Sequence, residues 1–105
     1  MPRIVPFKIK FTKSAGSIAY RMFFEEAPEA VTYDSTSLDF VGEVDSDGFV
    51  NVDLADVFAG SGVEGSYNIG IAAFDDRGNE SAMSKADNVP LDFRAPAAPG
   101  PIVFL

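Results

Sequence analysis

Hydrophobic and polar residues alternate along several short segments of this chain. Such a two-residue period is typical of a β-strand with one face in a core. The segment Phe7–Phe11 is the plainest case, because its apolar residues are separated by Lys8 and Lys10. The same pattern predicts further strands at 18–24, 38–44, 49–54, 66–74 and 89–93, of which 38–44 is the weakest. Only 53–58 has a helical pattern, and it is long enough for one turn.

The residues between these segments are typical of turns. Lys13–Ser17 separates the first two strands, and Asp45–Gly48 forms a short turn before the fourth. Pro90 places the last strand at a sheet edge or at a bulge, because proline has no N–H for a ladder hydrogen bond. Short strands at this spacing predict an all-β sandwich of about seven strands.

Composition excludes several classes of chemistry. The chain has 105 residues, of which 47% are hydrophobic and 23% charged, so it is long and apolar enough for one domain with a core. It contains no cysteine, histidine or tryptophan. Without thiolates or imidazoles there is no cysteine nucleophile, no Ser-His-Asp triad and no zinc–thiolate site. No apolar run reaches 18 residues, so we expect no membrane insertion.

Charge is distributed unevenly along the chain. The net charge of −8 combines +5 in residues 1–21 with −13 in residues 22–105. An acidic protein repels phosphate, so we expect no nucleic-acid partner. The basic leading segment either complements acidic neighbours within the sandwich or contacts another copy of the chain.

One stretch resembles a known family. Gly65–Ser81 is an alternating strand followed by an Asp-rich turn that ends Gly-Asn-Glu-Ser, and it is similar to the F strand and F–G loop of bacterial fibronectin type III domains. Tyr20–Phe24 is similar to the C strand of that family, and the resemblance spans roughly residues 7–93. It implies a fibronectin type III or immunoglobulin-like sandwich. It also implies that Tyr67 is the tyrosine of the E–F corner, whose hydroxyl bonds to nearby backbone.

The chain departs from that family at strand B, which usually carries a tryptophan. Phe11 stands at about the right distance before Tyr20 to fill this core position. Only Met1–Pro6 remains for strand A. In the F–G turn, Gly78 is expected to take a positive φ.

A Pro- and Ala-rich segment with an apolar end follows the last strand. We assign residues 1–93 to the sandwich and 94–105 to a linker with a C-terminal apolar strand, which resembles the segment that usually opens such a domain. Burial of each large apolar side chain contributes roughly 1.5–3 kcal/mol. Three arrangements are open: packing on its own sandwich, exchange into a neighbouring chain, or a frayed end. The candidate interaction residues are Ile102, Val103, Phe104 and Leu105.

Candidate metal sites are weak. Positions 1, 3, 5 and 9 of a calcium loop correspond to Glu43, Asp45, Asp47 and Asn51. Position 12, which needs a glutamate, is Leu54, and a tight hairpin turn explains the same residues without a metal. The turn around Asp75 is a similar candidate for a cation.

No pair of acids has an apolar pocket that would raise one pKa, so we expect no enzyme and no cofactor. The leading hypothesis is a non-catalytic structural or protein-interaction module that associates with itself head to tail by exchange of its C-terminal strand. The alternative is a carbohydrate- or protein-binding accessory domain of a secreted enzyme system. The first seven residues contain no apolar stretch typical of a signal peptide, while the resemblance favours a secreted or cell-surface location.

Overall fold

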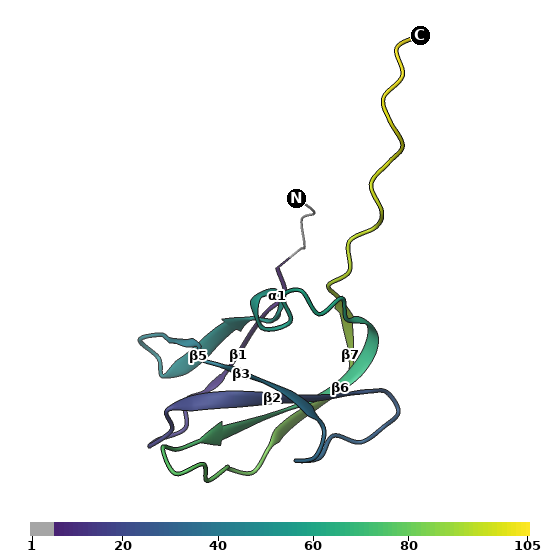
Figure 1. Ribbon diagram of the computed structural model, residues 1–105. Helices are drawn as coiled ribbons and strands as arrows, with labels where there is room; N and C mark the ends of the chain where they lie inside the picture. Colours follow the sequence, from purple (N-terminus) through teal and green to yellow (C-terminus); the bar gives the residue numbers. More distant parts are fainter. Residues whose placement is uncertain (1–5) are drawn as a thin grey trace.

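Two antiparallel sheets face each other in the structure, a computed structural model that describes residues 6–105 (Figure 1). The three-stranded sheet has the order β1-β5-β4, formed by β1 (Lys8–Thr12), β5 (Phe49–Asp53) and β4 (Glu43–Val44). The four-stranded sheet has the order β3-β2-β6-β7, formed by β3 (Thr36–Phe40), β2 (Ala19–Glu26), β6 (Glu64–Phe74) and β7 (Ser84–Asp92). The prediction of an all-β sandwich of about seven strands is confirmed.

The core lies between the inner faces of the two sheets. In β2, Tyr20 and Met22 are buried on the inner face, as the two-residue period requires. Val50 of β5 packs against Tyr20 and Ala73 of the opposite sheet. A larger cluster fills the other half of the core and consists of Met22, Leu54, Phe58, Ile69, Leu91 and Phe93.

The prediction of one strand at 38–44 is wrong, because the chain changes sheets within it. β3 ends at Phe40 and pairs with β2, whereas β4 begins at Glu43 and pairs with β5. Between them Gly42 passes so close to β5 that an added Cβ would overlap the Val50 side chain. Leu38, Phe40 and Val44 keep the same two-residue phase on both sides of this crossing, so periodicity alone does not reveal it.

The single helical turn predicted at 53–58 is α1 (Leu54–Val57). Asp53 caps its N-terminus, where one carboxylate oxygen accepts the N–H of Ala55 at 2.9 Å. The same oxygen accepts the N–H of Phe7 at 3.0 Å. One carboxylate therefore ties the start of β1 to the end of β5.

Aromatic rings close the sandwich next to α1. Phe58 is fully buried, and its ring centroid lies 5.6 Å from that of Phe93 and 5.0 Å from that of Phe24. Phe93 directly follows β7, and its N–H donates to the carbonyl of Val63 at 2.8 Å. The start of β1 and the end of β7 therefore lie at the same end of the sandwich, which we call the α1 pole (Figure 1).

The last strand is longer than the alternation predicts. β7 begins at Ser84 rather than at Val89, because polar residues of its first half also pair with β6. β7 is an edge strand, and a register shift interrupts its pairing between Tyr67 and Ile69. Pro90 thus lies on an edge strand close to an irregularity, as its missing N–H led us to expect.

Asn68 holds this irregularity in place. Its side chain is buried, its amide nitrogen donates to the carbonyl of Glu29 at 2.9 Å, and its oxygen accepts the N–H of Asn88 at 2.9 Å. Asn88 has a φ of 54°, a conformation that asparagine tolerates better than most residues. The bulge is therefore set by side-chain hydrogen bonds that no strand pattern predicts.

A small second core covers the outer face of the four-stranded sheet. Phe23, Val31 and Ala72 are buried together, and Met83 packs against them. Gly70 allows this contact, because a Cβ at that position would lie 2.8 Å from Met83 Sδ and 3.2 Å from Val31 Cγ1. The connection between β2 and β3 is thereby held against the sheet.

We predict that Gly70→Ala destabilises the protein by about 1–3 kcal/mol, because the added methyl overpacks this second core. Gly100→Ala is the matched control, since an added Cβ there meets nothing within 4 Å. Urea unfolding at low protein concentration measures both. Equal stability of the two variants would contradict the close packing at Gly70.

Candidate functional site

Among residues 6–105, the strand β1 is hydrogen-bonded on one side only, by β5. At its two ends, the N–H of Leu54 donates to the carbonyl of Phe7 at 2.8 Å, and the N–H of Lys13 donates to the carbonyl of Gly48 at 3.0 Å. In an antiparallel ladder alternate residues turn both backbone groups toward the partner, so the odd-numbered residues face β5. The residues whose N–H and C=O groups point to the open side are Lys8, Lys10 and Thr12.

The inner side of β1 is also incompletely covered. Phe7, Ile9 and Phe11 point toward the core but remain only half-buried, whereas Val50 on the neighbouring strand is fully buried. Phe11 packs edge-on against Tyr20, with ring centroids 4.8 Å apart. Phe11 therefore occupies an aromatic core position in the first described strand, beside an edge that one more strand would cover.

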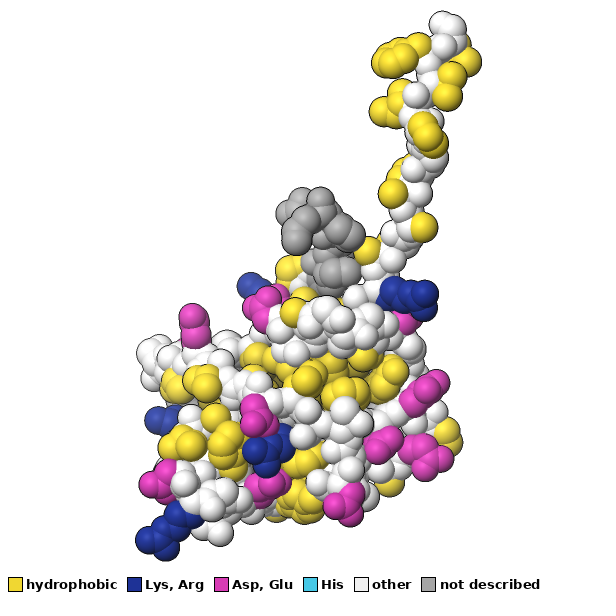
Figure 2. Space-filling model, viewed as in Figure 1, with side chains coloured by type: hydrophobic (Ala, Val, Ile, Leu, Met, Phe, Trp, Pro, Cys, Tyr) yellow, Lys and Arg dark blue, Asp and Glu magenta, His cyan; other side chains and the backbone are white. Residues whose placement is uncertain are grey.

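The C-terminal segment 94–105, which we call the tail, forms no helix or strand and extends away from the α1 pole (Figure 1). Ile102 is 86% exposed, Val103 76%, Phe104 94% and Leu105 121%. Figure 2 shows hydrophobic side chains along its whole length. Of the three arrangements considered from sequence, packing on its own sandwich is not the one that the structure adopts.

An open strand edge and an unpaired extended segment are the two halves of a β-strand addition site. The edge offers backbone donors and acceptors, and the segment offers the same groups together with apolar side chains. No bond is made or broken in such a site, and its chemistry is recognition alone. The four apolar residues predicted as interaction residues lie in the segment.

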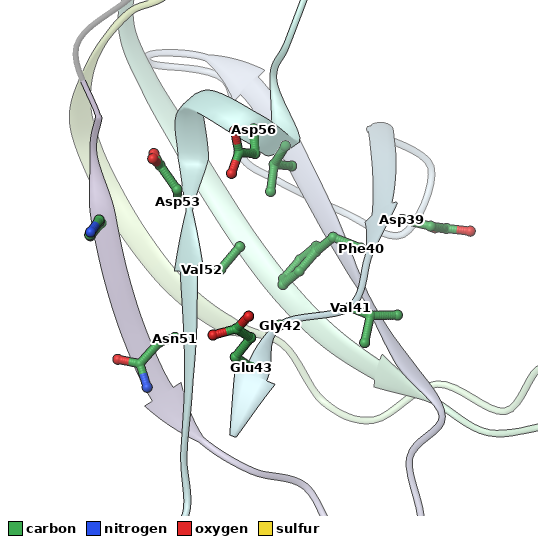
Figure 3. A pocket seen from close by; sticks show the side chains of 11 residues that line it. Asp39, Phe40, Val41, Gly42, Glu43, Asn51, Val52, Asp53 and Asp56 are labelled. Carbon is green, nitrogen blue, oxygen red and sulfur yellow. The ribbon is translucent and has the colours of Figure 1, made fainter. Parts of the chain in front are cut away.

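A concave groove of about 610 Å³ lies between β3 and β5, where the chain crosses between the sheets, and Lys8 of β1 also lines it. Figure 3 shows Phe40 and Val52 pointing toward one another across it, while Asp39 points away. Phe40 also packs against Tyr20 in the core, with ring centroids 5.8 Å apart, so it is no free aromatic platform for a sugar. Within residues 6–105, no group of three or more acidic side chains is placed to hold a metal ion.

The residues of the candidate calcium loop are engaged in a hairpin. One Asp45 oxygen accepts the N–H groups of Asp47 and Phe49 at 2.9 and 3.0 Å, and the other accepts the side-chain amide of Asn51 at 3.0 Å. The hydrogen bond from the Asn51 side chain is the largest cause that holds the pKa of Asp45 below its usual value, and the backbone N–H groups add to it. Glu43 lies on β4 and points into the groove region instead (Figure 3).

The turn after β6 has the same design. Asp75 accepts the N–H groups of Arg77 and Asn79 at 2.9 Å each and the side-chain amide of Asn79 at 3.0 Å. The hydrogen bond from the Asn79 side chain is the largest cause that lowers the pKa of Asp75. Gly78 in this turn has a φ of +85°, the conformation for which glycine is suited.

Part of the basic leading segment is neutralised within the sandwich. Arg21 forms ion pairs with Asp39 at 2.6 Å and with Glu80 at 2.7 Å, and its guanidinium lies over the Phe74 ring. Lys10 lies 4.5 Å from the centroid of the Phe49 ring. Arg3 lies outside the described residues, as does most of the Met1–Pro6 segment considered for strand A.

The hydroxyl hydrogen bond expected of a corner tyrosine concerns Tyr67, whereas the structure shows hydroxyl contacts at Tyr20. Tyr67 lies on β6, half-buried, with its ring 6.2 Å from that of Phe24, and its corner hydrogen bond stays a prediction. Sequence reasoning missed Tyr20, whose hydroxyl accepts the N–H of Ser14 at 3.2 Å and lies 3.3 Å from Ser17 Oγ. Turn residues six positions before a core tyrosine carry no motif that would have pointed to this contact.

Comparison with family models, curated proteins and solved structures found no match to this chain. None of the helices described between residues 6 and 105 has the length and apolar character needed to cross a membrane.

We predict that Asp45→Asn lowers stability at neutral pH and that this difference disappears in acid. The pKa of Asp45 is lowered in the folded state, so its stabilisation is present above the unfolded pKa near 4 and is lost as pH falls through the lowered value. Urea unfolding from pH 7 down to about pH 2 measures the difference. Asp47→Asn is the control, because in this hairpin the Asp47 contact runs through its N–H; an equal loss in both variants would contradict the role of the Asp45 carboxylate.

Proposed function

We propose that this protein is a non-catalytic structural module that associates with itself head to tail, by placing its C-terminal tail on the sheet edge of a neighbouring copy. The observation that carries the proposal is the coexistence of an open β1 edge with an extended apolar tail in one chain. Covering the edge and burying the tail are both favourable, so one contact satisfies both.

The resemblance to fibronectin type III domains supports the same proposal. In that correspondence β1 is strand B, β2 is strand C, and β6 and β7 are strands F and G. The position beside β1 is then that of strand A, and the tail has the Pro-rich, then apolar character of a segment that opens such a domain. The family in turn favours a role as an interaction module over catalysis.

Head-to-tail contact follows from the use of two different surfaces. The tail is the donor and the β1 edge the acceptor, so an open assembly of any length keeps one free donor at one end and one free acceptor at the other. Contacts of this kind form rings if the rotation closes and open filaments if it does not. The linker part of the tail contains Pro96 and Pro99, which favour an extended chain between copies.

We predict that light scattering across a wide concentration series finds a mass that rises above the 11.2 kDa of one chain. Deletion of residues 100–105 is expected to return the mass to that of a monomer, because the donor is removed. Val41→Asp is the matched control, since Val41 is 76% exposed but lies outside the tail and β1. A strict monomer at every concentration, or association that survives the deletion, would refute the proposal.

A further inference from the structure

The direction of the chain restricts how a tail can lie on β1. β1 starts at the α1 pole, and the tail leaves β7 at the same pole. A tail that turned straight back onto its own β1 would run parallel to it. Antiparallel pairing on the same chain would need a second reversal, after 94–99 had descended the length of the strand. A tail that enters a second copy from the opposite pole pairs antiparallel without any reversal.

Three β1 residues must be matched by the incoming strand. Lys8, Lys10 and Thr12 turn their backbone N–H and C=O groups to the open side. An antiparallel strand satisfies them when every second one of its residues lies opposite, with its own N–H and C=O turned toward β1. Each residue in such a position must possess an N–H.

The prolines of the tail select the set of residues that meets this requirement. Pro99 and Pro101 have no N–H, so they are tolerated only where the strand turns its backbone groups away from β1. The even-numbered residues Gly100, Ile102 and Phe104 then face β1. If the odd-numbered residues Pro101, Val103 and Leu105 faced β1 instead, Pro101 would lie opposite Thr12. The carbonyl of Thr12 would then have no N–H to accept.

We infer, on the basis of the proposed self-association, that the tail of one copy pairs antiparallel with β1 of a second copy in one register. Gly100 lies opposite Thr12, Ile102 opposite Lys10, and Phe104 opposite Lys8. All three open positions of β1 are thereby matched by residues that have an N–H.

This register also covers the half-buried side of β1. The residues between the matched ones point toward the core. Pro101, Val103 and Leu105 therefore lie over Phe11, Ile9 and Phe7, which are the side chains left half-buried at the open edge. On the outer face, Ile102 and Phe104 lie beside the aliphatic stems of Lys10 and Lys8.

The lysines of β1 also select what can bind there. If two β1 edges paired with each other, the lysines of the two strands would face one another and repel. Residues 95–105 carry no charged side chain, so the tail has no such conflict. Residues 94–99 span roughly 20 Å when extended, which provides the spacer between copies.

A disulfide ladder tests both the partner and the register. The chain has no cysteine, so any disulfide that forms must come from the two cysteines that are introduced. Lys10→Cys with Ile102→Cys places two residues opposite each other at a Cα separation of about 5.5 Å, within the range of a disulfide. Lys10→Cys with Val103→Cys is the matched control, because Val103 would point to the other face. Oxidised glutathione forms the bond, and non-reducing electrophoresis reads it.

The expected result is a ladder of covalent multimers from the 10/102 pair and little from the 10/103 pair. A ladder from 10/103 alone would overturn the register. A disulfide within single chains of the 10/102 variant would show that the tail pairs with its own β1 and not with a second copy. No ladder from either pair would overturn this register if light scattering of the unmodified chain still showed association. If light scattering also showed a strict monomer, the proposed function itself would fail.

A proline substitution tests the edge by an independent route. The N–H of Lys10 points away from β5, so Lys10→Pro removes no hydrogen bond of the β1–β5 ladder but blocks the open side. Lys10→Gln is the control for loss of the charge. We expect Lys10→Pro to remain a monomer with an unchanged circular dichroism spectrum, while Lys10→Gln still associates. Association of a folded Lys10→Pro variant equal to that of Lys10→Gln would overturn the inference.

Discussion

Within the part of the chain that the structure describes, β1 pairs with β5 alone, and this is the constraint on which the rest of the structure depends. Because the ladder is antiparallel, it divides the backbone groups of β1 into a satisfied set and an open set. It also leaves Phe7, Ile9 and Phe11 covered from one side only. The strand is therefore part of the core and part of the surface at once. A sheet edge of this kind is a place where proteins either prevent or use pairing with another chain.

The α1 pole decides the polarity of the molecule. Asp53 joins the start of β1 to the helical turn, and Phe58 stacks on Phe93 where β7 ends. Both contacts bring the beginning of one edge and the origin of the tail to the same end. The tail leaves the sandwich at this pole and points away from it. To pair antiparallel with β1, however, a strand must enter from the opposite pole. This geometry supports the contact between copies that we propose, rather than closure within one chain.

Three aspartates of the body serve as acceptors for nearby backbone. Asp45 and Asp75 each bind two N–H groups and one asparagine amide within their turns, and Asp53 caps α1. A calcium loop and a hydrogen-bonded turn use the same residue types at similar spacing, because both place oxygens around a tight bend. The spacing at Glu43–Asn51 therefore indicated a bend, and the hydrogen bonds show how that bend is held.

The sequence by itself determined the strands with clear alternation, the single helical turn, the all-β class and the apolar end of the tail. These features depend on local periodicity and on which residues prefer turns, both of which are written in neighbouring positions. Only the tertiary structure decided that 38–44 crosses between sheets, that Asn68 sets the bulge in β7, and that Tyr20 binds the turn at Ser14. It alone also decided which backbone groups of β1 stay open. Each of these depends on contacts between residues distant in sequence, and the two-residue period is the same whether a strand has one neighbour or two.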